Sequence, residues 1–409
     1  VRVRKERREI LPTEPIKPSL LECWNNMSIN EVVAVSAVRT AVGDFGGSLK
    51  NHSPIELAAL VIAEAVKRSG LTSEDIKHCV IGSVVHTEAH DMYLSRVAAL
   101  QAGLPKETPA LTVNRLCGSG LQAIVTAAQQ IQLGYCKAAV AGGAESMSRA
   151  GYLAQGARFG IRMGDGKLVD MMVAALNCPI EKVHMGITAE NIAEKWQISR
   201  EDQDALALEG HRRAAAAIEK GYFKEQILPV ELKSRKGSTQ FDTDEHVRGD
   251  VGEEKLASLR TVFKEDGTVT AGNASGLNDG AAAVVLMDKV AAEEAGISPL
   301  ARLVDYNVVG VDPKYMGIGP VPASRGLLEK HGLTVGDIDV WEVNEAFAAQ
   351  AIAVARDLKI DPEKINPNGS GIAIGHPIGA TGAIITAKAL YELQRTQGKY
   401  AVTSLCIGG

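Results

Sequence analysis

The sequence predicts an α/β protein built from two related halves, with a long insertion in the first. Strand-like and helix-like segments alternate over residues 31–145 and again over residues 301–409, which favours sheets covered by helices on both faces. A pattern recurs 262 residues apart: SGLTSEDIKHCVIGSV begins at Ser69 and HGLTVGDIDVWEVNEA at His331. The alternation is missing over residues 146–270, a stretch long enough to suggest an insertion over a site.

Composition is that of an ordinary globular protein. The chain has 409 residues, of which 45% are apolar and 23% charged, and its net charge is −5. It has no long basic run, which argues against a nucleic-acid partner. No apolar stretch approaches the roughly 20 residues of a membrane span. The six cysteines form no C-x-x-C pair and no Cys/His zinc spacing, so we expect free thiols in a reducing compartment and no metal site.

The first element of the core is expected directly after an atypical leader. Residues 1–30 are charged, contain proline and lack a regular apolar pattern. They have no apolar core of a secretory signal and carry too many glutamates for a transit peptide. We expect them to be a disordered extension ahead of a start at Met27. A buried strand is expected in EVVAVSAVRTAVG (31–43), followed by a helix over Pro54–Ser69 that ends at Gly70.

The first half continues with the same alternation. Strands are expected at His78–Val85 and Ala138–Gly143, with a helix over Met92–Ala102, and together they suggest a parallel sheet. In the insertion, Ser199 is expected to cap a helix that stops at Gly221. The expected parts are the extension 1–30, the first half 31–145 completed by 271–297, the inserted loop domain 146–270 and the second half 298–409.

The stretch LTVNRLCGSGLQAIVT predicts that Cys117 lies on a tight turn between a strand and a helix. A β-branched apolar run ends at Asn114, and helical apolar spacing begins at Leu121. The glycines that follow Cys117 permit close approach of a ligand or backbone. The first amides of the helix would point at the sulfur, lower the thiol pKa and favour a thiolate nucleophile. A small buried core cysteine is the alternative, and both interpretations stay open at this point.

The repeat predicts a matching turn near Gly379. That stretch reads NGSGIAIGHPIGATG and precedes an expected helix over Ala383–Leu393. The two turns would face each other at the sheet ends, where α/β sites form. His376 is then a candidate base or ion-pair partner for Cys117, or else a loop histidine bonded to backbone. The glycines depart by one place from G-x-G-x-x-G, so a dinucleotide site is only weakly indicated.

Two further stretches carry polar groups at strand ends. In VNEAFAAQ, Asn344 follows a strand over Val340–Val343, and Glu345 is expected to begin a helix. The Asn344 amide either holds a water or donates to an oxyanion, or caps the helix. The chain ends SLCIGG, so Cys406 follows the last strand and the Gly408 amide is a candidate oxyanion donor. A structural cysteine is the alternative for Cys406.

Seven motifs together make the chain resemble the thiolase family. They follow the family order from Glu31 to Gly409: NRLCGSGLQAI, GGAESMSRA, HMGITAENIA, TAGNASGLNDGAAA, NEAFAAQ, GHPIGATGA and CIGG. The chain looks most like the bacterial short-chain acetyl-CoA acetyltransferases, including the β-ketothiolases of polyhydroxyalkanoate synthesis. The resemblance implies a thiolase-like fold of two homologous halves in α-β-α-β-α layers. It also implies a cytoplasmic homotetramer, with a dimer as alternative, and no cofactor besides the coenzyme A thioester substrates.

The resemblance also implies a role for each candidate residue. Cys117 is the acylated nucleophile, His376 activates it, and Cys406 is the acid/base for the second substrate. Asn344 positions a water that forms one oxyanion hole with His376, while the amides of Cys117 and Gly408 form the other.

The implied substrate contacts lie in and around the insertion. His184 and Met185 line the pantetheine and acyl pocket, and Ser275 bonds the pantetheine amide. Arg248 lies by the adenosine end, or in a surface salt bridge. The remaining expected contacts are Ala271 and Phe263.

The implied reaction is the reversible Claisen condensation of acetyl-CoA with a short acyl-CoA to 3-oxoacyl-CoA and CoA, through an acyl-cysteine. The alternatives are a longer-chain 3-ketoacyl-CoA thiolase of β-oxidation and a non-catalytic thiolase-like lipid-binding protein. A ketoacyl synthase is disfavoured by the second cysteine. The family continues beyond CxGG with a final strand, so we expect the chain as given, ending at Gly409, to be less active or less stable.

Overall fold

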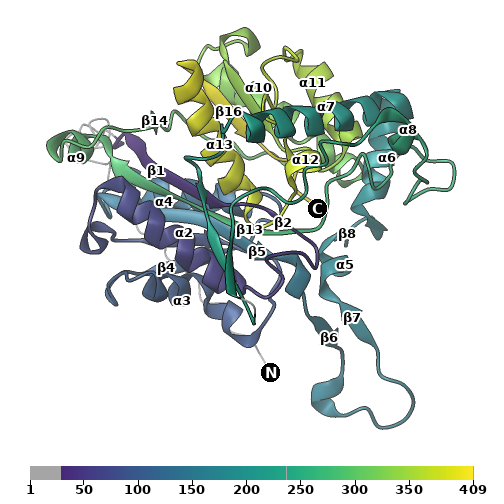
Figure 1. Ribbon diagram of the computed structural model, residues 1–409, viewed down its shortest axis with the longest axis horizontal. Coiled ribbons are helices and arrows are strands. Elements are labelled where there is room, and N and C mark those ends of the chain that lie inside the picture. The colour runs from purple at the N-terminus through teal and green to yellow at the C-terminus, as the bar shows by residue number, and fades with distance from the viewer. Residues whose placement is uncertain (1–28, 236, 409) are drawn as a thin grey trace, which may run out of the picture.

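The structure is a computed structural model that describes residues 29–235 and 237–408 (Figure 1). Its α-helices are α2 Pro54–Ser69, α3 Leu94–Gln101, α4 Ser119–Gln132, α5 Met171–Ala175, α6 Met185–Lys195, α7 Arg200–Glu219, α8 Glu253–Ala257, α9 Lys289–Glu294, α10 Pro320–Lys330, α11 Ala348–Leu358, α12 Gly371–Ile374 and α13 Thr381–Thr396. Its strands are β1 Val32–Thr40, β2 Gly43–Asp44, β3 Cys79–Gly82, β4 Ala110–Val113, β5 Ala138–Ser146, β6 Tyr152–Ala154, β7 Leu168–Asp170, β8 Asn177–Cys178, β9 Val183–His184, β10 Ile227–Leu228, β11 Val230–Ser234, β12 Gly237–Phe241, β13 Asn278–Asp288, β14 Ala301–Arg302, β15 Val340–Val343 and β16 Ala401–Ser404. The expected disordered extension over residues 1–30 lies outside the described residues, apart from Ile29 and Asn30.

An eight-stranded sheet forms the first half. Its main order is β10-β1-β13-β5-β3-β4, with β14 beside β1 and β2 beside β13. β1 and β5 are buried along their whole length. β3 runs parallel to β4 and β5, but β13 is antiparallel to both β1 and β5. The expectation of a parallel sheet is therefore wrong, because β13 follows the insertion and enters the sheet centre without the crossover that a parallel strand needs.

Helices and sheets stack in five layers (Figure 1). α2 and α3 cover one face of the large sheet, and α4 and α13 cover the other. α13 also packs on the pair β15–β16, whose far side is covered by α10 and α11. The layered thiolase-like fold implied by the sequence is confirmed.

Local signals set the helix ends as expected in most places. α2 has the predicted bounds: Ser53 and Glu56 form a reciprocal capping box, and Gly70 ends the helix with φ 75°. Ser199 caps α7, as predicted. The predicted helix over Met92–Ala102 is shorter, because its first turn belongs to a 3-10 helix over Ala89–Tyr93.

The second half repeats the first with unequal sheets. α4 begins at Ser119 and α13 at Thr381, the same 262-residue offset as in the sequence repeat. The second sheet has only the parallel pair β15–β16 among the described residues, because β14 pairs with β1 of the first half. The second half is thus a strand–helix unit, as expected, with a smaller sheet than the first.

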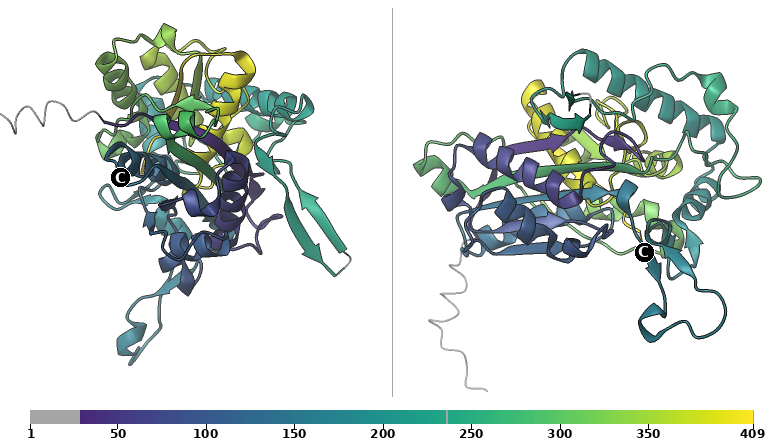
Figure 2. Two further views of the ribbon diagram at one scale, coloured as in Figure 1. Left: turned by 90° about the vertical axis from the view of Figure 1, so that its left-hand side faces the viewer. Right: turned by 60° about the horizontal axis from the view of Figure 1, so that its bottom comes forward.

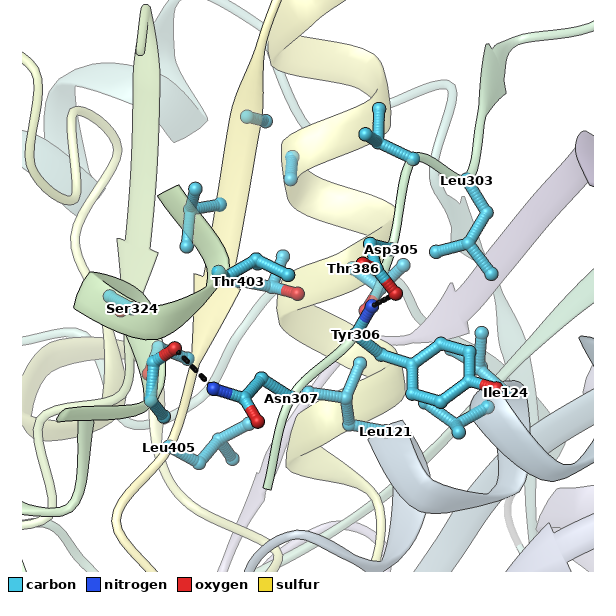
Figure 3. Close-up of a pocket in the computed structure, with 18 of the residues that line it drawn as sticks. Leu121, Ile124, Leu303, Asp305, Tyr306, Asn307, Ser324, Thr386, Thr403 and Leu405 are labelled. Atoms are coloured by element: carbon cyan, nitrogen blue, oxygen red, sulfur yellow. Dashed lines mark hydrogen bonds between the residues drawn. The ribbon is translucent and has the colours of Figure 1, made fainter. Parts of the chain in front are cut away.

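A cavity of about 830 Å³ lies between the two halves and is lined by residues of both. It is bounded by β16, α13, α4 and the segment 303–309 (Figure 3). Asn307 of that segment donates to the carbonyl of Ala323 at 2.9 Å. The segment is therefore fixed to α10 and does not pair with β16 in a sheet.

The insertion is tied to the core and also projects from it. β10 joins the large sheet beside β1, and a buried ion pair joins Arg39 of β1 to Asp244 at 2.7 Å. The arm β6–β7 and the hairpin β11–β12 extend away from the body (Figures 1 and 2). The division of the chain into four parts stays a prediction. Within residues 29–235 and 237–408, no helix has the length and apolar character needed to cross a membrane.

Candidate active site

Cys117 lies on the turn between β4 and α4, as predicted. Leu116 before it has a φ of 46°, and Gly118 after it is the N-cap of α4. The hydroxyl of Ser119 closes the turn: it accepts from the amide of Arg115 at 2.9 Å and donates to the carbonyl of Leu116 at 2.6 Å. This pair of bonds holds the Cys117 backbone in one conformation.

Burial keeps the thiol of Cys117 protonated at rest. It raises the pKa of Cys117 to about 11, and the nearby carboxylate of Glu145 also acts to raise it. The amide of Gly408 donates to the sulfur and lowers the pKa, but by less than burial raises it. The expected lowering of this pKa at the helix N-terminus is therefore wrong, because desolvation outweighs the amides. A base must remove the proton as the thiol reacts.

The segment after β16 passes directly over this turn. A Cβ on Gly118 would meet the side chain of Ile407 at 2.6 Å, and one on Gly408 would meet Met185 at 2.9 Å. Cys406 is buried, and burial together with the neighbouring Cys117 raises its pKa. The two cysteines thus share one site, between the Cys117 turn and α6.

His376 is buried and bonded through both ring nitrogens. Nδ1 is 2.7 Å from the hydroxyl of Thr381, and Nε2 is 3.3 Å from the amide nitrogen of Asn344. The backbone amide of His376 donates to the side chain of Asn278 at 2.9 Å. The alternative of a loop histidine whose ring bonds backbone is therefore wrong. Burial lowers the pKa of His376 to about 4, so the imidazole is neutral and can accept a proton.

Asn344 is inside the site and does not cap a helix. α11 begins only at Ala348, with Phe347 as its N-cap, so the helix start expected at Glu345 is wrong. Residues 344–347 instead form a buried turn against α12, where a Cβ on Gly371 would meet the side-chain oxygen of Asn344 at 2.7 Å. That oxygen has no hydrogen-bond partner among the described residues. It is a suitable acceptor for a water molecule.

The Cys117 turn and the His376 turn pack directly against each other. A Cβ on Gly120 would lie 2.8 Å from the amide nitrogen of Ala383, and one on Gly382 would lie 2.3 Å from that of Leu121. Only glycine permits this approach of α4 and α13.

Glu145, at the end of β5, ties the His376 turn to the loop after β3. Its carboxylate accepts from the amides of Val84, Val85 and Gly379 at 3.0, 3.2 and 2.9 Å. These bonds connect the loop after β3 to the loop that carries His376. Burial raises the pKa of Glu145 to about 8, against the lowering by the three amides.

Three of the expected substrate residues gather beside Gly408. His184 is the N-cap of α6, and its Nδ1 accepts from the amide of Gly186 at 3.0 Å. Its ring stacks on Phe263 at 4.5 Å. Met185 packs in one apolar cluster with Cys406, and Phe263 packs against that cluster. Part of the apolar wall of the site therefore comes from the insertion.

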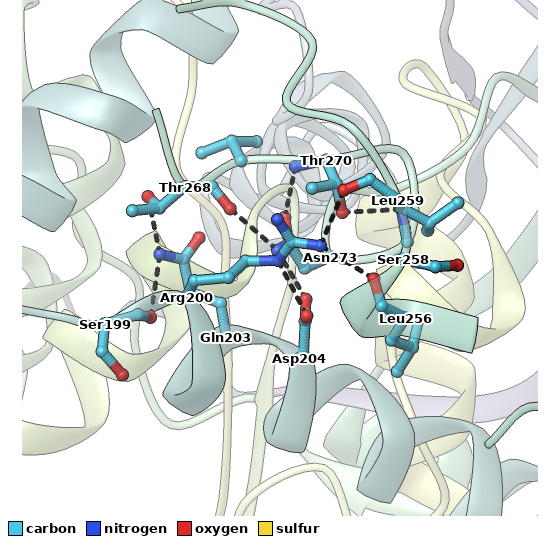
Figure 4. Close-up of polar contacts among 12 residues, drawn as sticks. Ser199, Arg200, Gln203, Asp204, Leu256, Ser258, Leu259, Thr268, Thr270 and Asn273 are labelled. Carbon is cyan, nitrogen blue, oxygen red and sulfur yellow. Dashed lines mark hydrogen bonds and ion pairs between the residues drawn. The ribbon is translucent and has the colours of Figure 1, made fainter. Parts of the chain in front are cut away.

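The loop with Ala271 and Ser275 is held between α7 and the Asn344 turn. Figure 4 shows Asn273 of this loop beside Asp204 and Thr270. Asn273 donates to Asp204 of α7 at 2.8 Å and accepts from the amide of Thr270 at 2.8 Å. The amide of Ser275 donates to the carbonyl of Ala346 at 3.0 Å. Ser275 thus lies next to the Asn344 turn, whereas Ala271 is exposed on the loop.

Arg248 lies apart from this group. Its guanidinium pairs with Asp44 at 2.9 Å, and its side chain is 54% exposed. Asp44 also bonds the ring of His246. The salt bridge considered as an alternative for Arg248 is therefore present.

Comparison with known proteins identifies the family. Residues 32–290 match the family described as Thiolase, N-terminal domain, and residues 297–409 match Thiolase, C-terminal domain. The chain belongs to the thiolase family.

Individual thiolases resemble the chain over nearly its whole length. Beta-ketothiolase BktB of Cupriavidus necator is 63% identical over 380 residues, which cover 93% of this chain and 96% of that protein. The crystal structure of the Bacillus anthracis acetyl-CoA acetyltransferase superimposes with a TM-score of 0.91 at 48% identity, covering 94% of this chain and 97% of that one. The crystal structure of human mitochondrial 3-ketoacyl-CoA thiolase in complex with CoA superimposes with a TM-score of 0.90 at 45% identity, covering 93% of this chain and 95% of that one.

Sequence reasoning missed three residues that hold the thiolase site together. Glu145 follows a buried run of small residues in AAVAGGAES, and a charged residue there is a signal that it has internal partners. Thr381 and Asn278 carry no such signal, because their partners are His376 and its loop, 98 residues away in the case of Asn278. Only the fold brings them together.

Proposed function

We propose that this thiolase is an acetyl-CoA C-acetyltransferase that reversibly condenses acetyl-CoA with a short acyl-CoA. The observation that carries the proposal is the close approach of the segment after β16 to the Cys117 turn, where a Cβ on Gly118 would meet the side chain of Ile407 at 2.6 Å. It joins the segment with the second cysteine to the turn with the first. The names of the relatives, beta-ketothiolase and acetyl-CoA acetyltransferase, support the same activity.

In the first half-reaction, Cys117 takes the acetyl group. Neutral His376 accepts the thiol proton while the sulfur attacks the thioester carbonyl, and the amides of Cys117 and Gly408 donate to the oxyanion. The bond from the acetyl carbon to the CoA sulfur then breaks. The leaving CoA thiolate takes the proton of the Cys406 thiol, so Cys406 becomes a thiolate and His376 keeps the Cys117 proton on Nε2.

In the second half-reaction, the Cys406 thiolate removes a proton from the methyl group of a second acetyl-CoA and returns to its thiol form. The enolate oxygen receives hydrogen bonds from the protonated Nε2 of His376 and from a water held by Asn344, whose oxygen lacks a partner among the described residues. The carbanion attacks the acetyl carbon, the bond from that carbon to the Cys117 sulfur breaks, and the sulfur takes back its proton from Nε2 of His376, which returns to its neutral form. No step needs a cofactor besides the CoA thioesters.

The proposed preference for short acyl groups follows from the side chains around Cys406. Met185, Phe263 and Phe347 pack in and against its apolar cluster, and Phe263 meets Phe347 edge to face at 6.2 Å. These side chains fill space that a long acyl chain would need. The experiment is thiolysis of acetoacetyl-CoA, 3-oxovaleryl-CoA and longer 3-oxoacyl-CoA by the same preparation. Fastest cleavage of the short substrates supports the proposal, and fastest cleavage of long ones indicates a β-oxidation thiolase.

Acylation is tested separately by intact mass after incubation with acetyl-CoA. We expect an acetyl adduct that Cys117→Ala abolishes. Its absence from the unmodified chain would favour a non-catalytic acyl-CoA-binding protein.

We also propose that the chain works as a homotetramer in the cytoplasm. The arm β6–β7 exposes large apolar side chains, with Phe159 at 88% and Met163 at 96%, and such projecting apolar surface favours contact with other copies. The mechanism needs Cys117 and Cys406 as free thiols, which a reducing compartment preserves. Sedimentation equilibrium should give a tetramer that F159D/M163D reduces to dimers. A dimer in the unaltered chain would contradict the tetramer.

A further inference from the structure

The hydroxyl of Thr381 stands between His376 and its own turn. Its oxygen lies 2.7 Å from Nδ1 of His376 and 2.9 Å from the carbonyl oxygen of Pro377. Thr381 and His376 are both nearly fully buried. A hydroxyl has a single proton to donate, so the two contacts determine where the protons lie.

Both contacts are hydrogen bonds in only one arrangement. The carbonyl of Pro377 can only accept, so the hydroxyl must donate to it. The hydroxyl oxygen must then accept from His376, which places the imidazole proton on Nδ1. Nε2 is left with a lone pair, which can accept from the Asn344 amide 3.3 Å away.

The first half contains the same device with a different partner. Ser119 occupies the position of Thr381, as the first residue of α4. Its hydroxyl also donates back into the turn, to Leu116 at 2.6 Å, and accepts from a turn donor, the amide of Arg115, at 2.9 Å. An accepting hydroxyl at this helix position is therefore a repeated feature of the two turns.

We infer that Thr381 is a positioning residue that fixes the tautomer of His376 with the proton on Nδ1 and the basic lone pair on Nε2. This inference rests on the proposed role of His376 as the base. Without the hydroxyl, the buried Nδ1–H would have no acceptor in the turn. The proton would then favour Nε2, where it blocks acceptance of the Cys117 proton.

The first test reads the tautomer directly in the unaltered protein. Nitrogen-15 NMR of histidine-labelled chain, with the His376 signals assigned by their loss in His376→Asn, should show a protonated Nδ1 and a bare Nε2. A protonated Nε2 would overturn the inference. This test does not depend on how any Thr381 variant folds.

The second test measures single-turnover acylation by acetyl-CoA. Thr381→Val should slow acylation by about 100-fold, the lower range for loss of general-base catalysis, with KM for acetyl-CoA little changed. Thr381→Ser should restore most of the rate, because it keeps the hydroxyl. Thr386→Val is the matched control, since it removes a hydroxyl bonded to the Gly382 carbonyl on the same helix.

Two outcomes would overturn the inference: acylation by Thr381→Val at the unaltered rate, or acylation by Thr381→Ser as slow as by Thr381→Val. Failure of the proposed function is distinct from both, because the unaltered chain would then form no acetyl-enzyme.

Discussion

The two helix-initial turns of this thiolase share a framework and differ in chemistry. α4 and α13 begin at equivalent positions, each with a hydroxyl that bonds back into its turn. The first turn carries Cys117, and the equivalent position in the second is Gly379. A side chain at Gly379 would lie 2.5 Å from the carboxylate of Glu145. One copy of the repeat thus holds the proposed nucleophile, and the other leaves room for it and carries the proposed base.

The difference also concerns protonation. Burial raises the pKa of Cys117 to about 11 and lowers that of His376 to about 4. Both groups are therefore neutral at neutral pH, and no thiolate–imidazolium pair is stable before substrate binds. The two turns together make a site in which charge develops only during the reaction, where fixed amides can stabilise it.

The largest effect should follow from removing either reactive group. Cys117→Ala and His376→Asn should each lower thiolysis of acetoacetyl-CoA by about 10⁴-fold or more, because residues of one catalytic unit fail together. The double variant should be no slower than the slower single variant. If the fold loss of rate in the double variant equals the product of the two single losses, the two turns act independently.

The contact between the turns can be tested through stability. Gly382→Ala should destabilise the fold by about 1–3 kcal/mol in urea unfolding, because overpacking forces backbone to move. Gly120→Ala should cost less, since its Cβ would meet backbone at 2.8 Å and that of Gly382 at 2.3 Å.

Gly252→Ala is the matched control for both glycine variants. Nothing lies within 4 Å of its added Cβ, so stability should hardly change. An equal tolerance of alanine at Gly382 and Gly252 would contradict the close packing of α4 and α13.

The buried base should make the fold acid-sensitive. The unfolded chain binds a proton at His376 below about pH 6.5, but the folded chain does so only near pH 4. This stabilising contribution is present above pH 6.5 and is lost as pH falls toward 4. At pH 5 the loss is about 2 kcal/mol. His376→Asn should therefore lose less stability than the unaltered chain between pH 7.5 and 5 in urea unfolding, and an equal loss in both would contradict the burial of a neutral imidazole.

The sequence was sufficient to predict the elements that depend on local signals. The capping box and Gly70 define α2, and the 262-residue repeat correctly indicated that the turn near Gly379 meets the Cys117 turn. It was insufficient for properties that arise from packing. The direction of β13 depends on how the chain returns from the insertion, and the pKa of Cys117 depends on desolvation that no motif encodes. The partners of Glu145 come from two separate loops, so spacing could not reveal them.

The smallest predicted effect tests the carboxylate of Glu145, which bonds the amide of Gly379 in the second turn and lies near Cys117 of the first. Glu145 is neutral below a pH of about 8 and charged above it, and its charge raises the pKa of Cys117. Glu145→Gln removes that charge, so alkylation of Cys117 by iodoacetamide should be faster than in the unaltered chain at pH 9. The two rates should converge below pH 8, where Glu145 is protonated in any case.

Glu88→Gln is the control for this comparison, because Glu88 pairs with Arg149 at the surface at 3.3 Å. It should leave the alkylation profile of Cys117 unchanged, as followed by peptide mass spectrometry. A Glu145→Gln rate that differs from the unaltered rate by the same factor at pH 7 and pH 9 would mean that Glu145 acts on Cys117 through its three amide bonds alone. If the two alkylation rates differ only at high pH, the charge of Glu145 is what slows the alkylation of Cys117. The group that holds the second turn in place would then also set the pKa of the thiol in the first.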